Sequence, residues 1–208
     1  MLPHTGDAMN TIKTDIPEKL KSRLYPAVLE QFSKHDFHDV NIRDISKVTG
    51  ISTATLYKYF DSKEELLFRI IDEKLNELGD LMRLHIAGLV NTKEIFRKLF
   101  WVTMDFFDRN PELAVTTFIT VPLKRFMESG TWRREKEIDI LNNVIDKAKE
   151  RGAVDRDIDN RYYADIYFMI AHRHIHNWYF HGRKWNLADT IHDFFDFFWK
   201  IVKPMAEM

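Results

Sequence analysis

The stretch NIRDISKVTGISTATLYKYFDSKEELL, residues 41–67, decides the fold. Asn41 and Ser52 each precede a short run in which apolar residues recur three or four positions apart, which is typical of a helix with an N-cap. Gly50 lies between the two runs and can adopt the left-handed conformation that ends a helix. The stretch therefore predicts two short helices joined by a tight turn.

Longer helices are predicted on both sides of this stretch. Ser62 and Glu65 form a capping box, and the helix that they start continues to about Met82. Upstream, Pro17 suits the first turn of a helix, and Pro26 inside the same pattern is expected to kink it. Two short helices braced by a longer helix on each side are the arrangement of a helix-turn-helix unit.

The remainder of the chain also has the periodicity of helices. Apolar residues recur three and four apart almost everywhere, no alternating strand pattern is visible, and there are only 7 Gly and 6 Pro. Further helices are expected at about 93–109, 111–120, 132–151, 160–180 and 187–203. The sequence therefore predicts an all-α protein of about nine helices.

The composition limits the classes of function. There is no cysteine among the 208 residues, which excludes disulfides, thiolate metal sites and cysteine nucleophiles. The formal net charge is −1, and acidic residues slightly outnumber basic ones up to Lys74, so any binding to nucleic acid must come from a local arrangement of charges. No apolar run approaches the roughly 18 to 20 residues of a membrane span. We therefore expect a cytoplasmic protein that does not contact a membrane.

The opening stretch resembles the N-terminal signature of TetR-family transcriptional regulators. The positions that carry the resemblance are Ile45, Gly50, Ile51, Ser52, Thr55, Leu56, Tyr57, Phe60, Lys63, Glu65 and Leu66. Asp36 stands where the family usually has glycine, Asn41 where it has threonine, and Pro26 is uncommon there. These departures affect the geometry expected for the first helix.

The resemblance implies a division of the chain into two domains. Residues 15–82 would form a three-helix helix-turn-helix DNA-binding domain with a fourth, connecting helix, and residues 83–208 a helical bundle for ligand binding and dimerisation. Residues 1–14 are expected to be a disordered leader or one added for expression. The implied function is a nucleoid-associated, ligand-responsive homodimeric regulator. It would be a repressor that binds a pseudo-palindromic operator in double-stranded DNA and is released by a small effector.

By resemblance, the third helix enters the major groove, and its neighbours hold phosphates. Tyr59 is as well explained by burial as by a phosphate contact, whereas Lys63 would be assisted by the N-terminus of the fourth helix. The predicted DNA-binding residues are Asn41, Arg43, Lys47, Ser52, Thr53, Ala54, Thr55, Tyr57, Lys58, Tyr59 and Lys63.

The second half of the chain predicts a sensor and a dimer interface. Several of its helices are apolar on more than one face, so a second partner beyond the core should cover them; packed core is the simpler alternative. The predicted lining of a cavity for an apolar or aromatic effector is Phe100, Trp101, Met104, Phe107, Phe118, Phe126, Tyr167 and His174. The predicted dimerisation residues are Ile166, Met169, Ile170, Trp178, Phe194, Phe195, Phe198, Ile201 and Val202.

Other functions were weighed against this one. His172 and His176 lie four residues apart and Asp165 seven before His172, a spacing that could chelate a metal and, more distantly, support a metal-dependent enzyme. Hydrogen bonding in an interface or cavity explains the histidines better, so we expect no enzyme, no metal and no cofactor. An activator or a chromosome-organising protein of the same family is the nearer alternative.

Overall fold

The computed structural model describes residues 15–204, apart from the side chain of Trp132. The predicted leader, residues 1–14, lies outside the described residues. Within them there are ten α-helices and no strand. The helices are α1 Glu18–Lys34, α2 Ile42–Thr49, α3 Thr53–Tyr59, α4 Lys63–Ile86, α5 Thr92–Arg109, α6 Pro111–Val115, α7 Leu123–Glu128, α8 Glu135–Glu150, α9 Asn160–Phe180 and α10 Ile191–Val202. The expectation of an all-α fold is confirmed.

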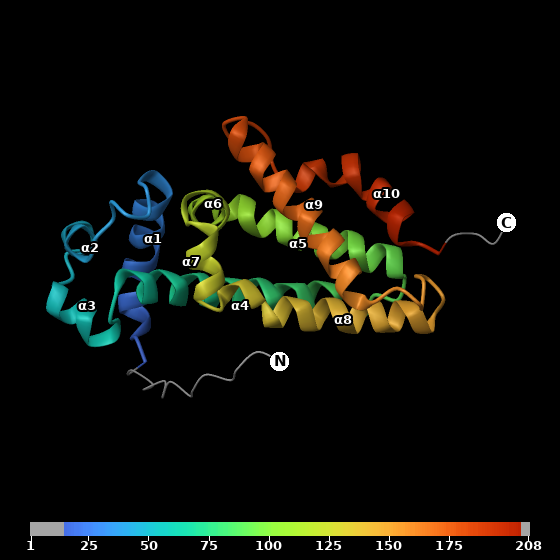
Figure 1. Ribbon diagram of the computed structural model, residues 1–208, viewed down its shortest axis with the longest axis horizontal. Helices are drawn as coiled ribbons and strands as arrows, with labels where there is room; N and C mark the ends of the chain where they lie inside the picture. The colour runs from blue at the N-terminus through green and yellow to red at the C-terminus, as the bar shows by residue number, and fades with distance from the viewer. Residues whose placement is uncertain (1–14, 205–208) are drawn as a thin grey trace.

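Helices α1 to α3 form a reading head at one end of an elongated molecule (Figure 1). Helix α4 leaves this head and runs along the molecule, where it packs against α5 and α8. Helices α9 and α10 cover the other side of α5. The predicted domain boundary between residues 82 and 83 falls inside α4, so one continuous helix belongs to both parts.

Local capping explains why the reading head folds as the sequence predicts. The Asn41 side chain accepts hydrogen bonds from two amides in the first turn of α2, at 3.0 and 3.1 Å, and Ser52 accepts one from Thr55 at the start of α3. Gly50 ends α2 with φ of 62°, a conformation that costs other residues energy. Caps and turn together fix the angle between α2 and α3.

A second contact joins the reading head to the rest of the molecule. Helix α6 and the π-helix that continues it, Thr116–Thr120, pack against α1. The Thr116 hydroxyl donates a hydrogen bond of 3.3 Å to the carbonyl of Leu29 in α1. The reading head is therefore held both by α4 and by the α6 segment.

The core of the second part of the chain, residues 83–204, is built largely from aromatic rings; this part is called the sensor after its expected role. Phe100 of α5 lies at its centre, with ring centroids 4.4 Å from Tyr167 of α9 and 4.9 Å from Phe198 of α10. Both partners are fully buried, and the Tyr167 hydroxyl lies 2.6 Å from that of Thr103. Such packing ties α5, α9 and α10 into one unit.

Candidate functional site

The outer face of the reading head carries the side chains expected to meet DNA. Tyr57 is 54% exposed, and Ala54 and Lys58 beside it on α3 are also exposed. Arg43 and Lys47 are exposed on the neighbouring α2. Both helices thus present basic side chains to solvent, and α3 also presents Tyr57.

The remaining predicted residues of α3 lie closer to the protein. Thr53 and Thr55 are half-buried, and the Thr55 hydroxyl lies 2.8 Å from the hydroxyl of the cap residue Ser52. Tyr59 is only 8% exposed and belongs to the core of the head. The Lys58 ammonium lies 5.7 Å from the centre of the Tyr59 ring, so the ring also supports a residue of the outer face.

Lys63 has a structural role that the sequence did not suggest. Its ammonium donates hydrogen bonds to the backbone carbonyls of Phe37, His38 and Val40 at 2.6, 3.3 and 2.7 Å. An ammonium has three N–H donors, so these carbonyls of the loop between α1 and α2 use all of them. A contact between Lys63 and a phosphate stays a prediction, and it would require one of these bonds to open.

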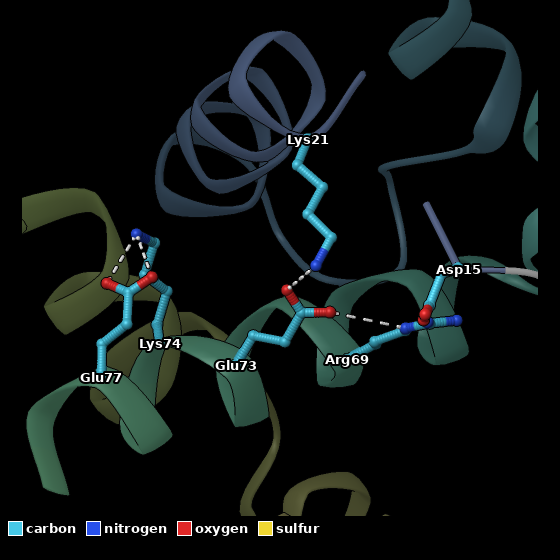
Figure 2. Close-up of polar contacts among 6 residues, drawn as sticks. All are labelled: Asp15, Lys21, Arg69, Glu73, Lys74 and Glu77. Atoms are coloured by element: carbon cyan, nitrogen blue, oxygen red, sulfur yellow. Dashed lines mark hydrogen bonds and ion pairs between the residues drawn. The ribbon is translucent and has the colours of Figure 1, made fainter. Parts of the chain in front are cut away.

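Ion pairs fix the reading head on α4 (Figure 2). Lys21 of α1 lies 2.7 Å from Glu73 of α4, and Arg69 lies 3.6 Å from the same carboxylate and 4.0 Å from Asp15. Tyr25 is buried beside them, and its burial, followed by the charge of Glu73, raises the pKa of its phenol. These contacts set the orientation of α1 on α4.

A groove of about 730 Å³ opens next to these ion pairs, between α1, α4 and the corner where α5 meets α6. Its walls are mostly charged, with Glu18 and Lys21 on one side, Lys74 and Glu77 on α4, and Arg109 at the corner. Lys74 and Glu77 pair with each other at 2.9 Å. The groove therefore lies between α1 and the rest of the molecule and is lined by both charged and apolar side chains.

The residues predicted to line an effector cavity lie in the sensor core but not in one place. Phe100, Met104, Phe107, Phe126 and Tyr167 are buried, and Trp101, Phe118 and His174 are half-buried. Phe107 meets Phe118 at 5.1 Å, whereas His174 stacks on Phe194 at 4.1 Å. Phe126 instead lies 6.3 Å from Phe68 of α4. These rings pack as core in this conformation, and their contact with an effector stays a prediction.

The predicted dimerisation residues divide into two groups by burial, and their role in an interface stays a prediction. The buried group packs into the core of the single protomer; it comprises Trp178, Phe194, Phe195, Phe198 and Val202. Met169 and Ile201 are exposed, and Ile166 and Ile170 are half-buried. Two further apolar side chains of these helices are exposed: Tyr162 of α9 at 50% and Phe197 of α10 at 65%.

The histidines of α9 point to separate partners. His172 Nε2 lies 3.4 Å from the guanidinium of Arg134, and His176 Nε2 lies 3.1 Å from the carbonyl of Phe118. Asp165 is exposed on the same helix. Over residues 15–204, no group of three or more potential ligands is arranged to hold a metal ion. No described helix is long and apolar enough to cross a membrane.

The sensor also holds a buried ion pair that was not predicted. Arg134 and Glu137 contact each other at 2.9 Å, and their side chains are 7% and 2% exposed. The signal in the sequence is weak, because an arginine followed by a glutamate three residues later is common on exposed helices. Burial of the pair depends on α9, which lies far away in the chain.

The N-terminal part of the chain matches a known family. Residues 26–70 match the family described as "Bacterial regulatory proteins, tetR family". The matched segment begins within α1 and ends within α4, so it contains the whole of α2 and α3. It includes all of the residues expected to contact DNA.

Known relatives extend the likeness beyond this segment. The fatty acid metabolism regulator protein of Bacillus subtilis (strain 168) is 20% identical over 173 residues, which cover 80% of this chain and 87% of that protein. The structure of the fatty acid degradation regulator FadR from Bacillus halodurans has a TM-score of 0.81 at 18% identity and covers 89% of this chain and 97% of that one. FadR from Bacillus subtilis in complex with stearoyl-CoA has a TM-score of 0.77, also at 18% identity, over 85% and 96% of the two chains. At these identities the structures show a shared fold.

Proposed function

We infer the function from one premise: the chain belongs to the TetR family of bacterial regulatory proteins and is a DNA-binding regulator of transcription. We propose that it acts as a homodimeric repressor, that each protomer places α3 in the major groove, and that a small effector releases it. Its outer face, with Tyr57 standing out from α3, is the observation that carries the proposal. We propose no catalytic role.

The proposed mode of DNA binding follows from the shape of the reading head. The exposed side chains of α3 would meet base edges, while Arg43 and Lys47 of α2 would contact base or phosphate. Because a single head reads only a few base pairs, two heads related by a two-fold axis would read a pseudo-palindrome. Its half-sites would lie roughly 34 Å or more apart.

The proposed interface consists of the apolar side chains that α9 and α10 leave uncovered. Met169, Tyr162, Phe197 and Ile201 are at least partly exposed there. Packing against the same residues of a second copy would remove their apolar surface from water, which is the driving force of a stable homodimer. The half-buried Ile166 and Ile170 would contribute at the edge of this surface.

The proposed effector is small and mostly apolar or aromatic. The aromatic core of the sensor favours this class, and the structurally similar B. subtilis FadR is known in complex with stearoyl-CoA, which carries a long apolar chain. Binding would move α4, which spans both parts of the chain, and so change the separation of the two heads. The release depends on different affinities of the effector for the two conformations.

Selection of binding sites from random duplex DNA tests the proposal. We expect enrichment of one palindromic sequence, and a complex of two protomers per duplex by analytical ultracentrifugation. Enrichment of no sequence, or binding as a monomer, would contradict it. Mapping of sites across the genome separates the alternatives, because a repressor or activator occupies few promoters whereas a chromosome-organising protein occupies many sites.

A further inference from the structure

The buried ion pair in the sensor differs from the ion pairs on the surface of the molecule. The guanidinium of Arg134 donates to one oxygen of Glu137 through Nε at 3.0 Å and Nη2 at 2.9 Å. Both side chains are almost completely buried, whereas Lys21 and Glu73 keep about a quarter or more of theirs exposed. Burying two charges costs solvation energy that a surface pair does not lose. A pair kept under these conditions calls for a reason other than stability.

The backbone at Arg134 is strained as well. Arg134 lies immediately before α8 with φ of 46°, in the left-handed region that non-glycine residues seldom adopt. Strain of this kind costs on the order of 1 kcal/mol and is concentrated at binding sites. The conformation directs the guanidinium into the sensor, where α9 lies against it.

Uncharged groups from α9 and the π-helix surround the pair. The Arg134 guanidinium stacks over the Phe168 ring at 4.7 Å, and its Nη1 lies 3.4 Å from His172 Nε2. The Phe118 ring lies 4.8 Å from the imidazole of His172. Burial and, after it, the charge of Arg134 lower the pKa of His172 to about 3, so this imidazole is neutral at physiological pH.

The π-helix beside the pair carries two hydroxyls that suggest a missing partner. Thr117 Oγ1 and Thr120 Oγ1 are buried and have no hydrogen-bond partner within residues 15–204. Thr117 precedes Phe118 and Thr120 follows it by two residues in the same π-helix, and the Phe118 ring lies 4.8 Å from His172. Buried hydroxyls normally have a partner, and π-helical turns are frequent at ligand sites. Both features point to a polar group of a ligand at this place.

The charge balance determines which polar group fits. Arg134 and Glu137 already neutralise each other, and His172 is uncharged. Asp72 lies near Glu137, and desolvation of its carboxyl, followed by the charge of Glu137, raises its pKa. The residue as a whole is still exposed, so solvent screens its charge. A charged ligand group would either remain unpaired in the interior or leave one member of the pair unpaired. An uncharged oxygen avoids both, and it can accept from Arg134, since Nη1 carries two N–H groups and only one of them can lie along the 3.4 Å contact with His172 Nε2.

We propose that the Arg134–Glu137 pair forms the polar end of the effector site and selects an apolar molecule with an uncharged oxygen group, such as an ester or ketone, over a carboxylate or an ammonium. The site is argued from the structure alone; only the role of its ligand as an effector rests on the proposed function. The apolar body would lie among the rings of Phe107, Phe118 and Phe168, which close the cluster in this conformation.

Three probes with apolar chains of nearly the same length test the proposal on the full-length protein: methyl octanoate, octanoate and octyltrimethylammonium. Equilibrium affinities are measured by isothermal titration calorimetry or by thermal shift. Because a buried unpaired charge is expensive, we expect the ester to bind at least about tenfold more tightly than either charged probe. Equal or tighter binding of a charged probe, or no binding of the ester, would overturn the proposal.

Substitutions in the pair should change the preference in opposite directions. Glu137→Gln leaves Arg134 unpaired and should transfer the preference to octanoate, whereas Arg134→Gln leaves Glu137 unpaired and should transfer it to octyltrimethylammonium. Circular dichroism checks that each variant is folded. The double variant Arg134→Gln with Glu137→Gln is again uncharged and should still prefer the ester. An unchanged preference in folded single variants would contradict the role of the pair.

Operator binding by the same samples separates this proposal from the proposed function. If the protein binds its operator as a dimer but does not prefer the ester, the inference about the pair fails alone. If it prefers the ester but binds no operator, the proposed function fails and the site stands.

Discussion

Two tyrosines two residues apart in α3 have opposite environments, although both belong to the same seven-residue helix. Tyr57 points to solvent, and Tyr59 lies in the core of the reading head. A separation of two residues turns a side chain about 200° around a helix, so one helix can dock through one tyrosine and present the other. Substitution of Tyr57 should therefore affect DNA binding, whereas substitution of Tyr59 should affect the stability of the reading head.

Tyr57→Ala and Lys58→Ala should weaken operator binding without loss of stability. Both side chains are exposed, so their truncation removes contacts with DNA and little packing in the free protein. For each we expect a loss of about 1 kcal/mol or more of binding free energy, roughly fivefold or more in affinity, by fluorescence anisotropy. Lys124→Ala, a change of an exposed lysine on α7, is the control. Unaltered affinity in both variants would refute the assignment of the outer face.

Removing the hydroxyl from each of two neighbouring threonines of the π-helix should change the free energy of unfolding in opposite directions. Thr117→Val replaces a buried hydroxyl that lacks a partner in the described structure, and should raise the free energy of unfolding by about 1 kcal/mol. Thr116→Val removes the bond to the Leu29 carbonyl and should lower it by about 1 kcal/mol. Urea unfolding of both variants provides the comparison, and a stabilised Thr116→Val would contradict it.

His172 should make the protein sensitive to acid. Burial lowers its pKa from 6.5 to about 3, so below pH 6.5 the unfolded chain takes up a proton that the folded chain does not. The contribution of His172 to stability is therefore complete above about pH 6.5 and falls as the pH drops toward 3. The slope should approach about 1.4 kcal/mol per pH unit. His172→Asn should reduce this slope in urea titrations at several pH values, and His35→Asn, at an exposed site, should not.

At the scale of elements, the start of α4 depends on one hydroxyl. Ser62 accepts a hydrogen bond of 3.1 Å from the amide of Glu65. It lies between α3 of the reading head and α4, so its capping bond lies where the two join. Ser62→Ala should lower the free energy of unfolding by about 1 kcal/mol. Ser33→Ala, inside α1, should leave it nearly unchanged, because its hydroxyl only returns to the Glu30 carbonyl of its own helix. Chemical denaturation with far-ultraviolet circular dichroism measures both.

The elements that the sequence predicted are those specified locally. Caps at Asn41, Ser52 and Ser62 and the turn at Gly50 depend on a few neighbouring residues, and the structure has them where the sequence placed them. The six-residue helix α7 was missed, because it is too short to show a period and Leu123 at its start is exposed. The change from α- to π-helix at Thr116 depends on packing against α1 and α9 and has no local signal.

Side chains of α10 show why the candidate sites were harder to predict than the elements. Phe197 is 65% exposed and the adjacent Phe198 is fully buried, although the helix is apolar on most of its surface. Where nearly every position is apolar, the sequence cannot say which face meets the core. The Arg134–Glu137 pair was missed for the reverse reason, since its residue types favour the surface.

At the scale of the whole molecule, the ion pair between Lys21 and Glu73 should matter for DNA binding although neither residue faces DNA. It joins α1 to α4, so Lys21→Met should loosen the orientation of the reading head and weaken operator binding several-fold. The effect on stability should be at most about 1 kcal/mol, because the pair is partly exposed. Lys93→Met, which breaks a 2.9 Å pair with Asp196 inside the sensor, is the control. Equal effects of both variants on affinity would argue against the link.

The mixture of acidic and basic side chains on the reading head has a consequence for the search for the operator. Lys47 lies 3.4 Å from Asp44, and Asp36 and Asp39 are exposed on the loop before α2. Binding to DNA of random sequence relies on phosphate contacts alone, and these carboxylates weaken them. The protein should therefore dissociate quickly from DNA that is not its operator. Few copies would then be sequestered along the chromosome, and a small pool per cell would suffice to keep one promoter occupied.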